Sequence, residues 1–329
     1  MSEDFGVIIC TCRFDFFLAK ACVASVRRAM GDVPITLFLD DDVDATALAK
    51  LYNLNLMYRS QLKDDFLREH NRGWGLPKIS LFWVSPYERF LYLDCDTIVW
   101  GDVAKAHLQG EWDMVIDPGD VASRPWAKGV GSDAWVNRDY WNTAMMEQQH
   151  PDFPWRKYAA ACFCTGCYAS RRGLFSLDEY KEIFAEKTRL PQLFLSAEMG
   201  FLNFMIFRAM ERGQINVQQR PIQMMAHFEN MAWLPDRYRI GPDGPIVKPD
   251  DITILHFTDP KPMTSSVGFH APFDYFRKEV VKRLGGVGRL APGLYIRIQE
   301  IEWRLTIWWR RSKRIKKLHK YIRPLLFWK

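Results

Sequence analysis

The first hundred residues alternate short apolar runs with longer segments in which apolar residues recur every three or four positions. The runs of strand length are residues 6–12, 35–39, 54–58 and 89–93, and the segments with helical spacing are 16–30, 45–52 and 77–84. Strands that alternate with helices are typical of α/β proteins, because a parallel strand pair needs a crossover that is usually a helix. We therefore expect an α/β fold with a mostly parallel central sheet.

The second half of the body is less regular. Residues 117–160 are rich in Gly, Pro and Trp, and this composition predicts a long irregular segment of functional importance. Further on, residues 198–211 and 273–284 have helical spacing, and 252–257 (ITILHF) is an apolar strand. The glycine-rich stretch 285–293 is typical of a linker. We therefore expect a body at 1–284, a linker at 285–293 and a C-terminal segment at 294–329.

Two carboxylates follow the strand in the segment RFLYLDCDTIVW, residues 89–100. On an extended chain Asp94 and Asp96 point to the same side, and two like charges held together need a cation. Carboxylate oxygens suit Mg²⁺ or Mn²⁺, which also bind substrate phosphates. Ligands of open α/β sheets lie beyond the carboxyl ends of the strands, where this pair is expected. The pair therefore predicts a metal site, although strand-end aspartates also form simple solvated turns.

An aspartate pair after an apolar strand is also typical of haloacid-dehalogenase-like phosphatases, in which Asp94 would be the nucleophile. Those enzymes normally carry the motif on their first strand, whereas some 90 residues precede it here. No later apolar strand ends in a convincing second aspartate pair. The phosphatase interpretation is therefore the alternative, together with a non-catalytic protein that binds sugar nucleotides.

An ordered set of motifs resembles the GT-A glycosyltransferases of family eight, the glycogenin and lipopolysaccharide galactosyltransferase group. The set comprises GVIICTC, ITLFLDDD, FLYLDCDTIVWGDV, CFCTGCYAS, SAEMGFLNFMI and ILHFTDPKPM, and it spans roughly residues 5–265. The resemblance implies a GT-A, Rossmann-like fold and transfer of a sugar from a nucleoside diphosphate sugar, with UDP favoured. It also implies Mn²⁺ or Mg²⁺ as the cofactor and retention of anomeric configuration.

The resemblance also assigns site residues. It implies that Asp94, Asp96 and His256 bind the metal and that Lys261 holds the donor diphosphate, while Lys78 contacts the donor phosphate or sugar. The remaining donor-binding residues that it implies are Thr11, Cys12, Arg13 and Asp40. Chemically, a cation and a lysine stabilise the charge that develops on a departing diphosphate.

The chain departs from the family pattern at several positions. Cys164 stands where the family has Asn, and Met199 stands where it has Gln, so Glu198 is left as the carboxylate that begins this helix. We expect Glu198 to be catalytic, as a base or as a charge that stabilises an oxocarbenium-like centre. The spacing from His256 to Lys261 is one residue shorter than usual. Seven cysteines leave a zinc site open, but apolar core packing is the favoured interpretation.

The C-terminal segment carries the second strong signal. Residues 296–329 contain eleven Lys or Arg against Glu300 and Glu302, a net charge of +9, so the total of +6 leaves −3 for the rest of the chain. Apolar residues recur at steps of three or four between the basic ones, and tryptophans accompany them. This pattern predicts a basic amphipathic helix on an anionic membrane surface, with packing on the body or RNA binding as the alternatives.

The expected protein is thus a peripheral membrane glycosyltransferase on the cytoplasmic face. The start of the chain lacks a basic signal-peptide region, and the odd number of cysteines favours reduced thiols. Its acceptor would be a membrane-located glycan or lipid-linked saccharide, contacted in part by the Trp-rich region 117–160. No nucleic-acid partner is expected, because the body is not basic.

Overall fold

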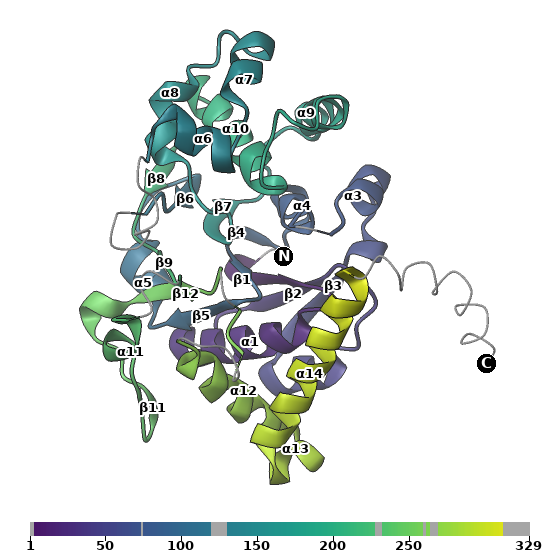
Figure 1. Cartoon of the computed structure of the whole chain (residues 1–329), viewed down its shortest axis with the longest axis vertical. Helices are drawn as coiled ribbons and strands as arrows, with labels where there is room; N and C mark the ends of the chain where they lie inside the picture. The colour runs from purple at the N-terminus through teal and green to yellow at the C-terminus, as the bar shows by residue number, and fades with distance from the viewer. Residues whose placement is uncertain are drawn as a thin grey trace, which may run out of the picture.

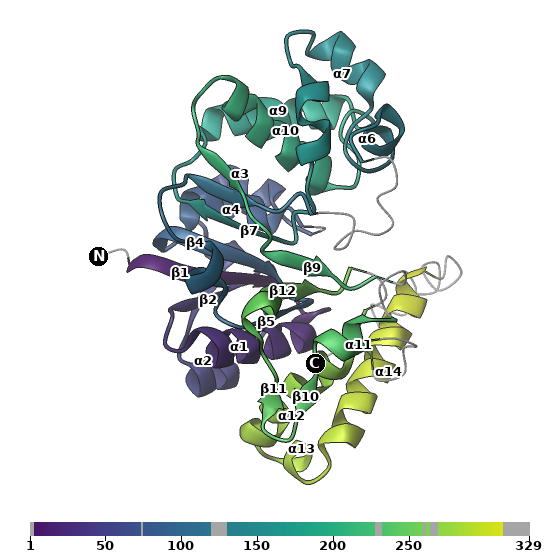
Figure 2. The same cartoon turned by 90° about the vertical axis from the view of Figure 1, so that its left-hand side faces the viewer.

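A seven-stranded, mostly parallel sheet forms the centre of the molecule, as predicted (Figures 1 and 2). The computed structural model describes residues 3–73, 75–119, 130–227, 232–258, 261–263 and 269–311. The strands of the sheet are β1 (Glu3–Thr11), β2 (Ile35–Leu39), β3 (Leu54–Tyr58), β4 (Tyr87–Asp94), β6 (Met114–Ile116), β7 (Cys167–Arg171) and β8 (Val217–Gln219). Their order is β3-β2-β1-β4-β7-β6-β8, and β7 runs antiparallel to its neighbours β4 and β6.

A second sheet of three strands lies beside the first. Its strands are β5 (Thr97–Trp100), β9 (Gln223–Met225) and β12 (Thr253–His256), in the order β5-β12-β9. A separate hairpin pairs β10 (Ile240–Gly241) with β11 (Gly244–Pro245). The sequence predicted β12 within one residue at each end, but it did not predict β9.

Helices cover both faces of the central sheet (Figure 2). They are α1 (Phe16–Met30), α2 (Thr46–Tyr52), α3 (Asp65–His70), α4 (Pro77–Val84), α5 (Val103–His107), α6 (Asp133–Asp139), α7 (Thr143–Gln149), α8 (Trp155–Tyr158), α9 (Leu177–Arg189), α10 (Glu198–Glu211), α11 (Leu234–Arg237), α12 (Ala271–Leu284), α13 (Val287–Leu290) and α14 (Pro292–Arg311).

The alternation of side chains along the strands explains why both faces need helices. Val7 and Ile9 of β1 pack into the core that includes α1 and α12, whereas Ile8 packs into the core that includes α4 and α10. A strand buried on both faces must be apolar throughout, which is the composition that identified it.

The region between residues 117 and 160 is not one irregular segment, so that prediction was wrong. Three short helices, α6, α7 and α8, occupy much of it, and Ser132 and Asn142 cap the first two. Trp135, Trp141 and Trp155 are buried in the core above the sheet. These three tryptophans stabilise the fold and are not exposed to stack on a sugar, and Trp126 lies outside the described residues.

The C-terminal part of the body is helical almost without interruption. The stretch predicted as a linker contains α13, and α14 begins at Pro292. Arg277 of α12 and Glu300 of α14 form a buried ion pair at 2.6 Å, which joins the two helices. Among the helices that the structure describes, none is both long and apolar enough to cross a bilayer. Residues 312–329 of the predicted tail lie outside the described residues.

Candidate active site and metal centre

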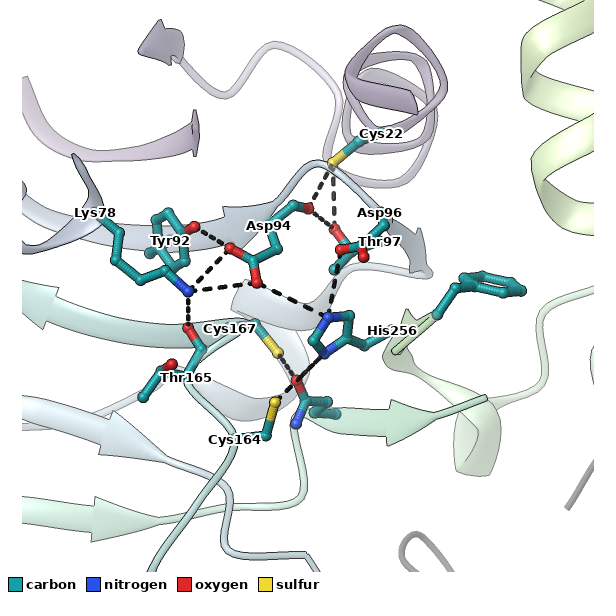
Figure 3. Close-up of polar contacts among 12 residues, drawn as sticks. Cys22, Lys78, Tyr92, Asp94, Asp96, Thr97, Cys164, Thr165, Cys167 and His256 are labelled. Carbon is teal, nitrogen blue, oxygen red and sulfur yellow. Dashed lines mark hydrogen bonds and ion pairs between the residues drawn. The ribbon is translucent and has the colours of Figure 1, made fainter. Parts of the chain in front are cut away.

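The three residues predicted to bind a metal meet where the two sheets adjoin (Figure 3). Asp94 ends β4, Asp96 lies in the turn before β5, and His256 ends β12, which pairs with β5. One ligand atom from each residue lies within 4.8 Å of the others. His256 Nε2 is 3.3 Å from Asp96 Oδ1 and 3.9 Å from Asp94 Oδ2.

The sequence pattern predicted that the two aspartates lie on one extended strand, and this prediction was wrong. The chain turns at Cys95 and Asp96, so that β4 belongs to the seven-stranded sheet and β5 to the three-stranded one. The Thr97 hydroxyl donates to the Asp94 carbonyl at 2.7 Å and stabilises this turn. The turn, rather than a strand repeat of two, brings both carboxylates to the same point.

Two lysines contact the carboxylate pair, one at each aspartate. Lys78 Nζ is 3.1 Å from Asp94 Oδ1 and 3.0 Å from Glu198 Oε1, and it also donates to the Thr165 carbonyl at 3.0 Å. Lys261 forms an ion pair with Asp96. Lys78 is almost fully buried, with 1% of its surface exposed, so its charge depends on the carboxylates around it.

These contacts shift the pKa values of the group. Burial opposes the ionisation of Asp96, but Lys261 and His256 outweigh it and hold the pKa of this carboxyl below its usual range. Burial would lower the pKa of His256, yet Asp96 raises it to about 10. Without a metal ion, the imidazole is therefore cationic at neutral pH. Its positive charge lies beside the two carboxylates, where a bound metal ion would also lie.

The donor set fits a divalent cation. Two carboxylates and one imidazole suit Mn²⁺, and the carboxylates also suit Mg²⁺. Gly166 leaves room for the imidazole, because a Cβ at this position would lie 2.0 Å from His256 Cε1. Among the residues that the structure describes, this is the one group of three or more His, Cys, Asp or Glu with ligand atoms so close together. No group of cysteines meets that criterion within the same residues, and all seven cysteines are free thiols.

Glu198 begins α10 and lies beside Lys78, and its catalytic role stays a prediction. Its Oε1 also accepts a hydrogen bond from the Thr165 hydroxyl at 3.1 Å. The two residues before it, Ser196 and Ala197, have φ of 50° and 57°, a left-handed backbone that costs about 1–3 kcal/mol per residue for side chains other than glycine. Gly75 lies against its carboxylate, since a Cβ there would lie 2.2 Å from Glu198 Cδ. The carboxylate is thus held in a constrained position.

The residues predicted to meet the base and ribose lie near the ends of β1 and β2. The Thr11 hydroxyl donates to Asp15 Oδ1 at 2.6 Å, and the Cys12 amide donates to the same oxygen at 2.8 Å. The Arg13 side chain donates to the Asp42 carbonyl at 3.0 Å. Asp40 pairs with Arg59 and accepts from the Gly73 amide. Their role in donor binding stays a prediction.

Three polar residues of the site were not anticipated: Tyr92, which bonds Asp94, Thr165, which bonds Lys78 and Glu198, and Gln223. Gln223 of β9 is buried, and its Oε1 lies 3.0 Å from His256 Nδ1. It is 33 residues from His256 in the chain, and the sequence contains no signal that pairs β9 with β12.

Solved structures with a similar fold include two glycosyltransferases. No protein-family model and no curated protein matches the chain. The bifunctional glycosyltransferase WbbM, in its apo form, has 13% sequence identity over 86% of this chain and 52% of its own, with a TM-score of 0.53. The glycosyltransferase GlyE of Streptococcus pneumoniae TIGR4 has 14% identity over 86% of this chain and 62% of its own, with a TM-score of 0.54.

The chain therefore spans about half to three fifths of the length of these two structures. At such identity the likeness concerns the fold. The predicted α/β fold with a mostly parallel, GT-A-like central sheet is confirmed, whereas the basic amphipathic character of the C-terminal helix stays a prediction.

Proposed function

We propose that this chain is a metal-dependent glycosyltransferase, which transfers a sugar from a nucleoside diphosphate sugar to a membrane-located glycan or lipid-linked acceptor. The observation that carries the proposal is the meeting of Asp94, Asp96 and His256 at the carboxyl end of the sheet in a GT-A fold. UDP-sugar is the favoured donor, Mn²⁺ or Mg²⁺ the favoured cofactor, and retention of configuration the favoured outcome.

The geometry supports a role for each charged residue. In the transfer, a bond forms between the acceptor hydroxyl oxygen and the anomeric carbon, the bond from that carbon to the diphosphate breaks, and the diphosphate leaves with the electron pair. A divalent cation held by Asp94, Asp96 and His256 would stabilise the charge on the leaving diphosphate. Lys261 lies next to Asp96 and would add a second positive contact. Glu198 would act near the reacting sugar, as base or as stabilising charge.

The fold disfavours the phosphatase alternative. Asp94, its presumed nucleophile, is held by the Tyr92 hydroxyl and Lys78, and it ends the fourth strand of the chain, not the first. The other alternative, a non-catalytic protein that binds sugar nucleotides, would have the same binding geometry as a glycosyltransferase and would differ from it only in lacking turnover. Release of UDP from a UDP-sugar, measured after binding is established, separates the two.

The test of the proposed donor is a calorimetric titration of the purified protein with UDP and with GDP, each with and without Mn²⁺. We expect UDP to bind only when Mn²⁺ is present, because the diphosphate and the carboxylates repel each other without a cation. GDP is the matched control, since it differs from UDP only in the base. Metal-independent binding, or binding of neither nucleotide, would contradict the assignment.

The exposed face of α14 supports a membrane surface as the second partner. An apolar stripe runs along this face, and its residues recur at steps of three or four. The exposed members of the stripe are Leu294, Ile298, Ile301, Leu305 and Trp308. Ile296 and Glu300 of the same helix are buried against the body. The helix therefore packs on the body with one side and presents the apolar stripe with another.

Basic residues accompany the apolar stripe. Arg297 and Arg304 lie seven positions apart, about two helical turns, and both are exposed. Cationic residues beside an apolar stripe favour an anionic bilayer, at about 1 kcal/mol per basic residue close to the surface.

The position of α14 relative to the site supports the same proposal. Trp303 packs against Phe14 and Phe17, with ring centroids 5.5 Å and 6.2 Å apart. Phe14 follows Thr11, Cys12 and Arg13, the predicted donor-binding turn. A bilayer along the outer face of α14 would therefore lie close to the predicted donor site, where a lipid-linked acceptor needs to reach it.

We expect Ile298→Glu to weaken binding to vesicles that contain anionic lipid by about tenfold or more, because it places a carboxylate in the apolar stripe. Moving a whole exposed side chain of this size out of water is worth about 1.5–3 kcal/mol, and about half of Ile298 is exposed and free to enter the bilayer. Ile246→Glu is the matched control, since both isoleucines are 47% exposed and Ile246 directly follows strand β11, outside α14. Co-sedimentation measures both. Equal loss in the two variants, or none in Ile298→Glu, would contradict the membrane surface.

A further inference from the structure

The two ring nitrogens of His256 face different surroundings (Figure 3). Nε2 lies 3.3 Å from Asp96 Oδ1 and faces the carboxylate pair. Nδ1 lies 3.0 Å from Gln223 Oε1 and, at 3.8 Å, also contacts Cys164 Sγ. A neutral imidazole carries one proton, so the group that faces Nδ1 decides whether Nε2 offers a lone pair to a cation.

A second contact supports the orientation of the Gln223 amide. Cys167 Sγ lies 2.8 Å from the same Oε1. Burial raises the pKa of the Cys167 thiol well above its usual value, so the sulfur keeps its proton and donates it. The amide group therefore presents its oxygen, an acceptor, to this side of the site. Nδ1 must then be the donor in its contact with Gln223.

Gln223 is itself held firmly. It begins β9, which pairs in parallel with β12, and its partner in the register is Ile254, two residues before His256. The side chains of Gln223 and His256 therefore lie on the same face of the three-stranded sheet. The backbone amide of Gln223 donates to Asp117 Oδ2 at 2.6 Å, and both residues are buried.

We propose that Gln223 is a positioning residue of the metal centre: its amide oxygen holds the proton of His256 on Nδ1 and so keeps Nε2 directed at the cation. The inference rests on the proposed function, because it takes the Asp94, Asp96 and His256 group as the metal site. It adds a residue that acts through His256 and does not touch the metal. Outer partners of this kind typically contribute about 10- to 100-fold to metal affinity.

The test compares Gln223→Leu with Gln223→Glu. Binding of Mn²⁺ in the presence of UDP is followed by electron paramagnetic resonance. We expect Gln223→Leu, which has no acceptor, to raise the Kd for Mn²⁺ by about 10- to 100-fold. Gln223→Glu keeps an acceptor oxygen and should retain affinity close to that of the wild type. Gln219→Leu is the matched control, since it makes the same substitution at an exposed glutamine of β8, outside the site, and should leave the Kd unchanged.

A second measurement does not depend on any variant. Nitrogen-15 NMR of the histidine-labelled wild-type protein with UDP and Mg²⁺, which is diamagnetic, identifies the protonated ring nitrogen of His256. We expect Nδ1 to carry the proton, and a proton on Nε2 would overturn the inference even if Gln223→Leu failed to fold. Unchanged Mn²⁺ affinity in a folded Gln223→Leu would also overturn it, while the proposed function would stand. A wild-type protein that binds no Mn²⁺ with UDP would overturn both.

Discussion

Replacement of Asp96 by Asn is expected to lower kcat/KM for sugar transfer by about 1000-fold, a loss of about 4 kcal/mol in transition-state stabilisation. Asp96 is the carboxylate that contacts both His256 and Lys261. Asn has nearly the same shape but no charge, so the variant weakens the proposed metal site and also breaks the ion pair with Lys261, the proposed diphosphate contact. The rate of UDP release from a UDP-sugar, measured across Mn²⁺ concentrations, gives the effect.

The control for this variant is Asp178→Asn, at the start of α9. The Asp178 side chain is highly exposed, and its ion-pair contact to Lys181 is long, at 3.9 Å. The substitution should therefore leave kcat/KM unchanged. If Asp96→Asn kept wild-type activity at every Mn²⁺ concentration, the metal site assigned to Asp94, Asp96 and His256 would be wrong.

Local periodicity explains why much of the fold was predictable. Helices α1, α4 and α10 and strands β2 and β3 begin and end at the residues that the apolar spacing indicated. Helices α1, α4 and α10 and strand β2 are long or largely buried, and β3 packs partly buried apolar residues against the core, so the repeat is visible in the sequence. The strand-end position of Asp94 followed from the same reasoning, because a carboxylate cannot continue a buried strand without a partner.

Elements defined by tertiary packing were not predictable in the same way. Helices α6, α7 and α8 have only four to seven residues each, too few for a repeat to be visible, and only the caps Ser132 and Asn142 signal two of them. The tryptophans among them are buried in a core whose other members include residues distant in the sequence, such as Phe204, which packs on Phe153.

The same limit applies to the site. Gln223 and His256 meet because β9 pairs with β12, and strand pairing between distant segments leaves no local pattern. The positive φ of Ala197, which sets the position of Glu198, is likewise invisible in a sequence where alanine normally indicates a helix. The chemistry-bearing residue types could thus be identified, but their geometry required the fold.

The second large effect concerns stability. Lys78→Met should lower the free energy of unfolding by about 3 kcal/mol, because it leaves the carboxylates of Asp94 and Glu198 without their buried cation. We place the effect at the lower end of the range for broken buried pairs, since the Asp94 side chain keeps 30% exposure to water. Chemical denaturation without divalent ions measures it.

Two further variants distinguish the loss of charge compensation in Lys78→Met from a simple loss of packing. Lys181→Met removes a partly exposed lysine whose ion pairs to Asp64 and Asp178 are both long, at 3.9 Å, and it should cost less than about 1 kcal/mol. Adding Glu198→Gln to Lys78→Met should restore part of the lost stability, because it removes one of the two uncompensated charges. If the double variant were less stable than Lys78→Met alone, charge compensation would not be the role of Lys78, and the residue would instead stabilise the core through its aliphatic stem.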